Sequence, residues 1–371
     1  MTKNNYLDAV KKHELNFSSF SVYRNAIYGF AALWIVVFHG VELKNITFLP
    51  SMPFLEKTIG SGNIGVDIFV LLSGVGLYFS FSKGPKLLSF YKNRIVRVYI
   101  PYIMMALPYF IYLYAQKQMD IGLFIKNILT INFWTDESTP ISFWYVSAIL
   151  VFYIVYPLIH KFIFHGADLK ISDKFTISQE KRELIRCMIL VVVSIVIGAL
   201  IFYKSPETYK VIDKVPSRFT AFIIGCYLGK FVKEGKRFSS TTLIIAAFIV
   251  GGMYPLYAGR ILKGIWLRYY GSLTGIALVF ILSQLFIVLS RINIDKIMAF
   301  FGTISLEIYM LHIIARRIFV TTPLYNNHAF RNYMIFGVIA IIAAILVGLL
   351  EKPIFKILLK KKSTEKRKHL K

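Results

Sequence analysis

Apolar stretches of 17 to 25 residues recur along most of this chain of 371 residues, and they limit what it can fold into. A helix rises about 1.5 Å per residue, so each stretch is long enough to cross roughly 30 Å of hydrocarbon. The sequence therefore predicts an all-α, polytopic integral membrane helix bundle with about ten transmembrane helices. The ten stretches are 25–43, 62–82, 98–115, 141–160, 187–203, 216–232, 241–258, 265–289, 297–315 and 333–350.

Composition favours a membrane protein over a water-soluble fold. Hydrophobic residues make up 56% of the chain and charged residues only 17%, a balance that soluble domains rarely reach. The formal net charge of +25 would suggest a nucleic acid partner in a soluble protein. Here lysine and arginine cluster between the apolar stretches, so we predict no nucleic acid partner and expect these residues to contact membrane lipids.

The distribution of basic residues also predicts the orientation. With the N-terminus in the cytoplasm, the cytoplasmic segments hold 30 of the 44 Lys and Arg residues. The positive-inside rule thus favours a topology with both termini inside. We divide the chain into a cytoplasmic N-terminal segment at 1–24, one transmembrane domain at 25–350 and a basic cytoplasmic tail at 351–371. The first apolar stretch is not preceded by the features of a cleaved signal peptide.

Several familiar site chemistries are excluded by residue type and spacing. Cys187 and Cys226 both lie inside apolar stretches, which leaves no disulfide framework or four-ligand metal site. His160 and His165 are five residues apart, off register for two ligands on one helical turn, so no metal is predicted. The glycines at positions 60–65 spell GxGxxG, but no strand precedes them, so we reject a dinucleotide site.

Four ionisable residues inside the apolar stretches are the main candidates for chemistry, because a polar side chain in hydrocarbon costs a few kcal/mol. They are His39, Asp67, Glu307 and His312. His39 lies 15 residues above the cytoplasmic Arg24, and Asp67 and His312 each lie 16 residues above a cytoplasmic lysine. All three are therefore expected at one level, roughly 22–24 Å from the inner face.

The shared level favours catalysis at His39, as a general base or a transient acyl carrier. Asp67 is then expected to fix the tautomer of His39 and to stabilise its charged form. Glu42 or Glu307 is an alternative partner that could orient a histidine. The competing interpretation is that the histidines are interfacial and simply solvated.

Arg94 and Arg97 are three residues apart in the predicted cytoplasmic loop 83–97 and therefore share a helical face. A paired guanidinium face suits phosphate. The alternative is topological anchoring by the positive-inside rule, which Lys83 and Lys86 already satisfy. Spacing alone does not decide between the two.

Five segments together give the chain a resemblance to a known family, the family-3 membrane acyltransferases, over about residues 20–350. They are YGFAALWIVVFH ending at His39, GVDIFVLLSG at 65–74, KNRIVRVYIPY at 92–102, FWYVSAILVFYIVYP at 143–157 and GTISLEIYMLH ending at His312. Bacterial members of that family transfer acyl groups, commonly acetyl from acetyl-CoA, to envelope polysaccharides and related glycans.

The resemblance implies a membrane O-acyltransferase in the bacterial cell membrane, with an envelope glycan or a lipid-linked saccharide as acceptor. It implies His39 as the catalytic residue and Arg94 and Arg97 as partners of the phosphates of coenzyme A. Trp144, Glu307 and His312 are predicted to bind substrate.

This sequence departs from the family pattern at one position of the first span. Family members usually have an arginine eleven residues before the first-span histidine, where this sequence has Tyr28. Arg24, one turn below Tyr28 on the same face, is predicted to reach the same region and to bind the cofactor.

Two other protein classes remain as alternatives. A transporter or flippase of a lipid-linked sugar would also place ionisable residues in a helix bundle, but the sequence shows no inverted repeat or paired interrupted helices. A structural membrane protein would not need ionisable groups at matched depth on several helices.

Overall fold

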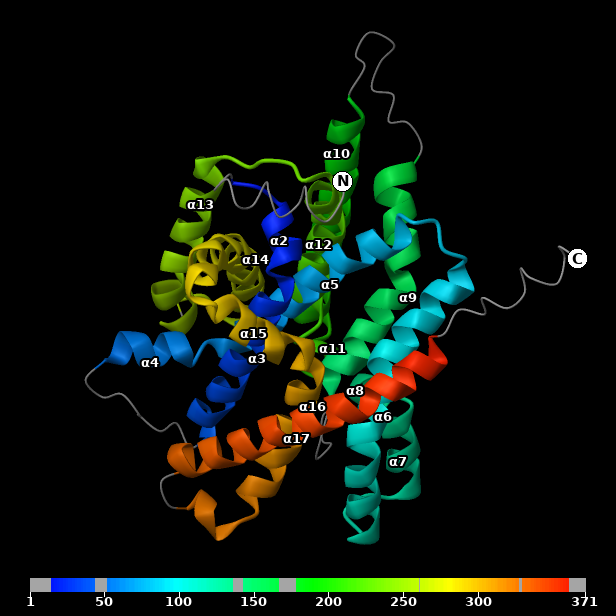
Figure 1. The fold of residues 1–371 in the computed structure, drawn as a ribbon, viewed down its shortest axis with the longest axis vertical. Helices are drawn as coiled ribbons and strands as arrows, with labels where there is room; N and C mark the ends of the chain where they lie inside the picture. Colours follow the sequence, from blue (N-terminus) through cyan, green and yellow to red (C-terminus); the bar gives the residue numbers. More distant parts are fainter. Residues whose placement is uncertain are drawn as a thin grey trace, which may run out of the picture.

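The structure is a computed structural model that describes residues 15–43, 52–135, 143–166, 178–259, 261–326 and 329–359. These residues form helices and connecting turns, and the described part contains no β-strand beyond an isolated bridge between Asn16 and Arg237. The predictions for residues 1–14 and for 360–371 of the tail lie outside the described residues. The predicted all-α membrane bundle is confirmed (Figure 1).

Eight helices or helix pairs in the described residues are long and apolar enough to cross a membrane. They are α3 (Arg24–Val41), α4 with α5 (Pro53–Phe81), α6 (Leu87–Ala115), α9 (Trp144–His165), α10 (Gln179–Lys204), α13 with its π-helical end (Ser240–Ala258), α14 with η4 (Gly264–Ile292) and α17 (Ala329–Leu358). A ninth span is formed if α15 (Ile294–Thr303) and α16 (Ser305–Val320) count as one, although they meet at a bend of 68°.

The remaining predicted stretch, 216–232, is the helix α12 (Pro216–Glu234). It carries Arg218, Lys230, Lys233 and Glu234 and is therefore less apolar than the eight spans. Most of α12 is buried against α5 (Gly65–Phe81), so it lies at the centre of the bundle and little of it faces lipid. The predicted count of about ten is close to what the helices support.

Glycines permit the closest helix crossings in the bundle. A Cβ atom at Gly29 of α3 would collide with the backbone of Met298 in α15, and one at Gly302 would collide with the backbone of Asn25. Gly74 of α5 and Gly225 of α12 face each other's helix in the same way. Small residues at such crossings let backbones approach closely, which is how helices associate in lipid.

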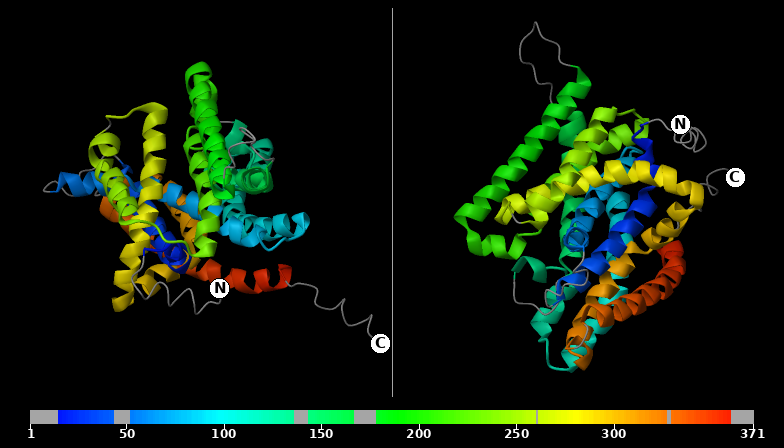
Figure 2. Two further views of the ribbon diagram at one scale, coloured as in Figure 1. Left: turned by 90° about the horizontal axis from the view of Figure 1, so that it is seen from above. Right: turned by 90° about the vertical axis from the view of Figure 1, so that its left-hand side faces the viewer.

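The helices α3, α15 and α16 lie side by side, and α17 crosses beside α16 (Figure 2). The outer helices expose apolar side chains at helical spacing, as expected for a surface that contacts lipid. On α10 these are Val192, Val196 and Leu200, and on α17 they are Ile335, Ile339, Ile342 and Leu346. The inner face of α3 packs against α15, α16 and α5, so polar residues on that face lie inside the bundle.

Shorter helices connect the spans. In chain order they are α2 (Ser18–Val22), η2 (Gly62–Ile64), α7 (Ile121–Ile128), α8 (Asn132–Thr135), α11 (Pro206–Ile212) and η5 (Pro323–Tyr325). The start of α7 is capped by Asp120, whose side chain accepts a hydrogen bond of 2.8 Å from the backbone N–H of Leu123. Of these segments, η2 contributes Asn63 to the lining of a cavity described next.

Candidate active site

Two cavities lie next to each other inside the bundle and share the side chains of Val66 and Tyr309 in their walls. We call the first the arginine chamber, because Arg24, Arg94 and Arg97 line it; its volume is about 230 Å³. We call the second the histidine chamber, because His39 lines it; its volume is about 370 Å³. The two chambers thus meet at one wall of the bundle.

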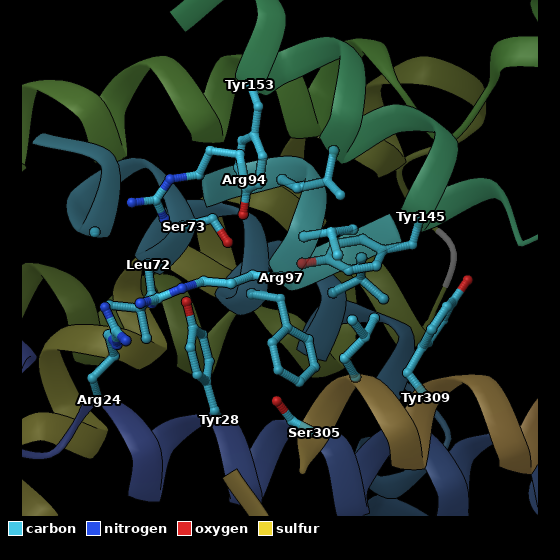
Figure 3. Close-up of a pocket in the computed structure, with 16 residues that line it drawn as sticks. Arg24, Tyr28, Leu72, Ser73, Arg94, Arg97, Tyr145, Tyr153, Ser305 and Tyr309 are labelled. Carbon is cyan, nitrogen blue, oxygen red and sulfur yellow. The ribbon is translucent and has the colours of Figure 1, made fainter. Parts of the chain in front are cut away.

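The arginine chamber collects the three arginines that the sequence predicted as a cofactor site. Arg24 begins α3, and Arg94 and Arg97 lie one turn apart in the first half of α6. Figure 3 shows their guanidinium groups on one side of the cavity and Tyr145 and Tyr309 on the other. No Asp or Glu is among the described residues that line this chamber, so an anion would meet cations without a competing carboxylate.

Two observations describe how the guanidinium groups of Arg94 and Arg24 are placed. The Nε of Arg94 is buried and has no hydrogen-bond partner within the described residues. A buried donor without a partner is costly, and a bound acceptor would remove that cost. The guanidinium of Arg24 lies over the ring of Tyr28, 5.6 Å from its centre. Arg24 thus lies against Tyr28, which follows it by one turn on the same helical face.

The histidine chamber contains His39 near the end of α3, with 18% of its side chain exposed. Its Nδ1 lies 3.1 Å from Oε2 of Glu42, one turn further along the chain, and 3.0 Å from Nη1 of Arg316. Arg316 also forms an ion pair of 2.9 Å with the same carboxylate oxygen. His39, Glu42 and Arg316 therefore form one connected cluster.

Nδ1 of His39 has a donor, Arg316, and an acceptor, Glu42, within hydrogen-bond distance and can bond only one of them; we assign it a proton directed at Glu42. A guanidinium paired with a carboxylate is a stronger contact than a guanidinium with a neutral ring nitrogen, so Arg316 is held mainly by Glu42. Burial raises the pKa of Glu42, but the hydrogen bond with His39 and the charge of Arg316 together hold that pKa below its ordinary value. An ionised Glu42 accepts the hydrogen on Nδ1, which leaves the lone pair on Nε2 of His39.

His312 lies directly beside His39, with the two ring centres 5.2 Å apart and the planes inclined by 30°. Its Nδ1 donates to the carbonyl oxygen of Ile308 at 2.8 Å, because a carbonyl can only accept. The Nε2 of His312 therefore has the lone pair, and it is buried without a hydrogen-bond partner in the described residues. The sequence predicted only a common level for these two histidines, and the structure places their rings side by side.

Asp67 has different partners from the one that the sequence suggested. Only 3% of it is exposed; Ser272 Oγ donates to its Oδ1, and Nη2 of Arg218 lies 3.4 Å from its Oδ2. The expected pairing of Asp67 with His39 is therefore corrected, because Glu42 occupies the position at Nδ1. Asp67 stands in the first turn of α5, where Arg218 from the adjacent α12 and Ser272 from α14 satisfy its carboxylate.

The three residues predicted to bind substrate are placed differently from one another. Trp144 lines the histidine chamber, where the guanidinium of Arg218 lies 4.8 Å from the centre of its indole ring. His312 contacts His39. Glu307 lines neither chamber; its carboxyl group hydrogen-bonds that of Glu351 on α17. Glu307 thus contacts α17 through a pair of carboxyl groups that requires a proton between them, and its role in substrate binding stays a prediction.

Several residues of the histidine chamber were not found from the sequence. They are Lys214, Arg218, Arg268, Arg316 and Arg317. The sequence contained one signal for these residues. They lie near the ends of apolar stretches on the predicted outer side, where the positive-inside rule expects few basic residues. Arg316 also follows His312 by four residues, the spacing of one helical face. Within the described residues no group of three His, Cys, Asp or Glu side chains could hold a metal ion.

Comparison with known proteins assigns the chain at the level of a family. The family model described as an acyltransferase domain, that of the family 3 acyltransferases, matches residues 25–350. No curated protein and no solved structure that was compared with the chain matches it significantly. The matched range contains both chambers.

Proposed function

Because this chain belongs to the family 3 acyltransferases, and is thus a membrane acyltransferase, we propose that it moves an acetyl group from acetyl-CoA to a hydroxyl of a glycan. The observation that carries the proposal is the wall shared by the two chambers: guanidinium groups line one side and His39 lines the other. A donor held by its phosphates in the arginine chamber would direct its thioester towards the histidine chamber.

The arginine chamber suits the phosphates of coenzyme A. Three guanidinium groups, a buried Nε donor on Arg94 and the lack of a described carboxylate in the lining match a polyanionic ligand. The volume of about 230 Å³ is small for the whole cofactor, so the chamber fits the phosphate end or the pantetheine arm. Lining tyrosines and aliphatic side chains, Tyr28 and Val98 among them, would contact the arm.

The chemistry at His39 follows from its hydrogen bonds. With its Nδ1 proton held by Glu42, the Nε2 lone pair takes the proton of the acceptor hydroxyl. The hydroxyl oxygen attacks the thioester carbonyl carbon, and the carbon–sulfur bond breaks as the tetrahedral intermediate collapses. The proton on Nε2 passes to the leaving thiolate, so the products are an ester and free coenzyme A. Glu42 stabilises the imidazolium formed between these steps.

A covalent route uses the same residues. His39 Nε2 attacks the thioester first, coenzyme A leaves, and the acyl-imidazole is then attacked by the acceptor hydroxyl. The two routes differ in one observable, because only the covalent route releases coenzyme A before the acceptor is present. The proposed acceptor is an envelope glycan or a lipid-linked saccharide at the outer side of a bacterial cell membrane.

The test is acyl transfer by the purified protein in lipid vesicles. Acetyl-CoA labelled in the acetyl group is added with a panel of glycan acceptors, and both labelled product and free coenzyme A are measured. The proposal expects label on the glycan and equimolar coenzyme A, both lost in a His39→Ala variant. Movement of a lipid-linked saccharide across the vesicle membrane without acylation would instead support the flippase alternative.

A further inference from the structure

The histidine chamber has an excess of positive charge for which the proposed chemistry at His39 has no use. Five basic side chains line it: Lys214, Arg218, Arg268, Arg316 and Arg317. They stand around the end of α3 that is remote from the predicted cytoplasmic face. The positive-inside rule expects basic residues on the cytoplasmic side, so membrane topology does not account for them.

Three carboxylates near the chamber neutralise only part of this charge. Asp67 pairs with Arg218 at 3.4 Å, Asp213 hydrogen-bonds Arg268, and Glu42 pairs with Arg316 at 2.9 Å. Each of these three arginines therefore has its own carboxylate. The pairing leaves two of the five cations to be explained.

Lys214 and Arg317 are the two cations in excess. Lys214 lies 3.8 Å from Asp213, whose other oxygen is already held by Arg268, and 42% of its side chain is exposed. Arg317 is exposed and pairs with no carboxylate among the residues that the structure describes. Both side chains line the same cavity as His39, where charged groups are partly shielded from water and interact more strongly.

We infer that the acceptor itself is anionic, a saccharide bearing a phosphate or carboxylate group that Lys214 and Arg317 hold while its hydroxyl faces His39. This inference rests on the proposed function, because it names the acceptor class for the same site. Guanidinium and ammonium groups bind both anions by charge-assisted hydrogen bonds. The donor phosphates have the separate arginine chamber beyond Val66 and Tyr309.

Three matched probes separate the possible acceptors: a neutral methyl hexoside, a hexose 1-phosphate and a methyl hexuronide. Binding of each labelled probe to the purified protein in vesicles is measured first, without donor, and acetylation is measured second. The expected result is that one or both charged probes bind at least tenfold more tightly than the neutral one. The charged probe that is preferred identifies whether the anion is a phosphate or a carboxylate.

Variants place the effect on the two cations in excess. In a Lys214→Ala/Arg317→Ala double variant, the preference for the charged probe is expected to fall by about tenfold or more, with the KM for acetyl-CoA unchanged. Replacement of both residues by Gln gives a second variant that keeps their size. Lys210→Ala is the matched control, since Lys210 lies on α11 beside Glu207 and does not line the chamber.

The experiment separates failure of this inference from failure of the proposed function. Equal binding of charged and neutral probes, or no binding of either charged probe, overturns the inference even if neutral glycans are acetylated. Competition between the charged probe and acetyl-CoA for one site also overturns it, because the cations would then serve the donor. Charge-selective binding lost in both double variants supports it, whereas absence of acetyl transfer to every acceptor refutes the proposed function alone.

Discussion

Nδ1 of His39 lies 3.1 Å from Oε2 of Glu42, and the two residues are three positions apart at the end of α3. A catalytic candidate and its carboxylate partner thus come from a single turn of backbone. Arg316, from the other end of the sequence, holds the same carboxylate oxygen at 2.9 Å. The local pair sets the tautomer of the ring, and the distant arginine fixes where the carboxylate points.

His39→Ala is expected to abolish acetyl transfer while leaving the protein inserted and abundant, because the side chain serves chemistry and borders a cavity that can accommodate its loss. Labelled glycan is measured in vesicles, with protein amount determined by immunoblot. His165→Ala, at the far end of α9 and outside both chambers, is the control and should keep wild-type activity. Full activity of the His39→Ala variant would show that His39 is not the catalytic residue.

Glu42→Gln is expected to lower kcat by roughly 100-fold with little change in KM for acetyl-CoA, because the amide no longer stabilises an imidazolium. The variant keeps the size of the side chain and should still fold, with stability reduced by loss of the ion pair with Arg316. Initial rates at varied acetyl-CoA concentration separate the two constants. A rise in KM with normal kcat would instead place Glu42 in donor binding.

The carboxylate of Glu42 should also make the stability of the protein depend on pH. The pKa of Glu42 is lowered in the folded protein, so its contribution to stability is fully present above the ordinary pKa of 4.5. That contribution is lost as the pH falls further, through the lowered pKa of the folded state. Thermal unfolding of the detergent-solubilised protein between pH 3 and 7 should therefore show a smaller acid destabilisation in Glu42→Gln than in the wild type.

Charge reversal at Arg94 or Arg97 is expected to weaken binding of acetyl-CoA with a marked salt dependence, and replacement by Lys should restore only part of the affinity. A guanidinium can bind phosphate through two parallel hydrogen bonds, whereas an ammonium acts as a point charge. Titration of acetyl-CoA against the purified variants measures this. Lys86→Glu is the control, because Lys86 precedes α6 and lies outside the arginine chamber. Equal affinities of the Arg and Lys forms would leave these residues as topological anchors.

Asp67→Ala is expected to destabilise the protein by about 3–5 kcal/mol, because it leaves the buried guanidinium of Arg218 without its carboxylate. Ser272→Ala removes only a hydroxyl that donates to the same carboxylate and should cost less, about 1–3 kcal/mol. Melting temperatures of the two variants in detergent give the comparison. If Asp67→Ala melts like the wild type but has lost turnover, Asp67 acts in catalysis after all.

The helix crossing between α3 and α15 can be tested with one added methyl group. Gly302→Ala is expected to destabilise the protein or change its activity, because the new Cβ atom would collide with the backbone of Asn25. Gly251→Ala is a matched control within a helix, since nothing lies within 4 Å of the Cβ position there. Equal melting temperatures of the two variants would show that the α3–α15 crossing can accommodate a methyl group at position 302.

Local sequence was sufficient for the membrane class and for most of the spans, although 216–232 is not among the spans of the described residues and 297–315 is bent by 68°. Apolar length and helical rise depend only on consecutive residues, so the span at 333–350 and the depth of His39 could be counted along the chain. The same count put His39 and His312 at one level, but their contact came only from the structure. The spacing of Arg94 and Arg97 likewise placed both on one helical face.

Only the tertiary structure decided which charged groups meet. Asp67 and Ser272 are 205 residues apart, and His39 and Arg316 are 277 apart, so no local pattern joins them. A residue count along a helix gives neither the rotation of the helix nor its neighbours, so it did not show that Asp67 pairs with Arg218. Glu307 contacts Glu351 of α17, which no local pattern indicated. Rotation and neighbours are set by side-chain packing between helices, and this packing brings five basic residues from separate segments around one histidine.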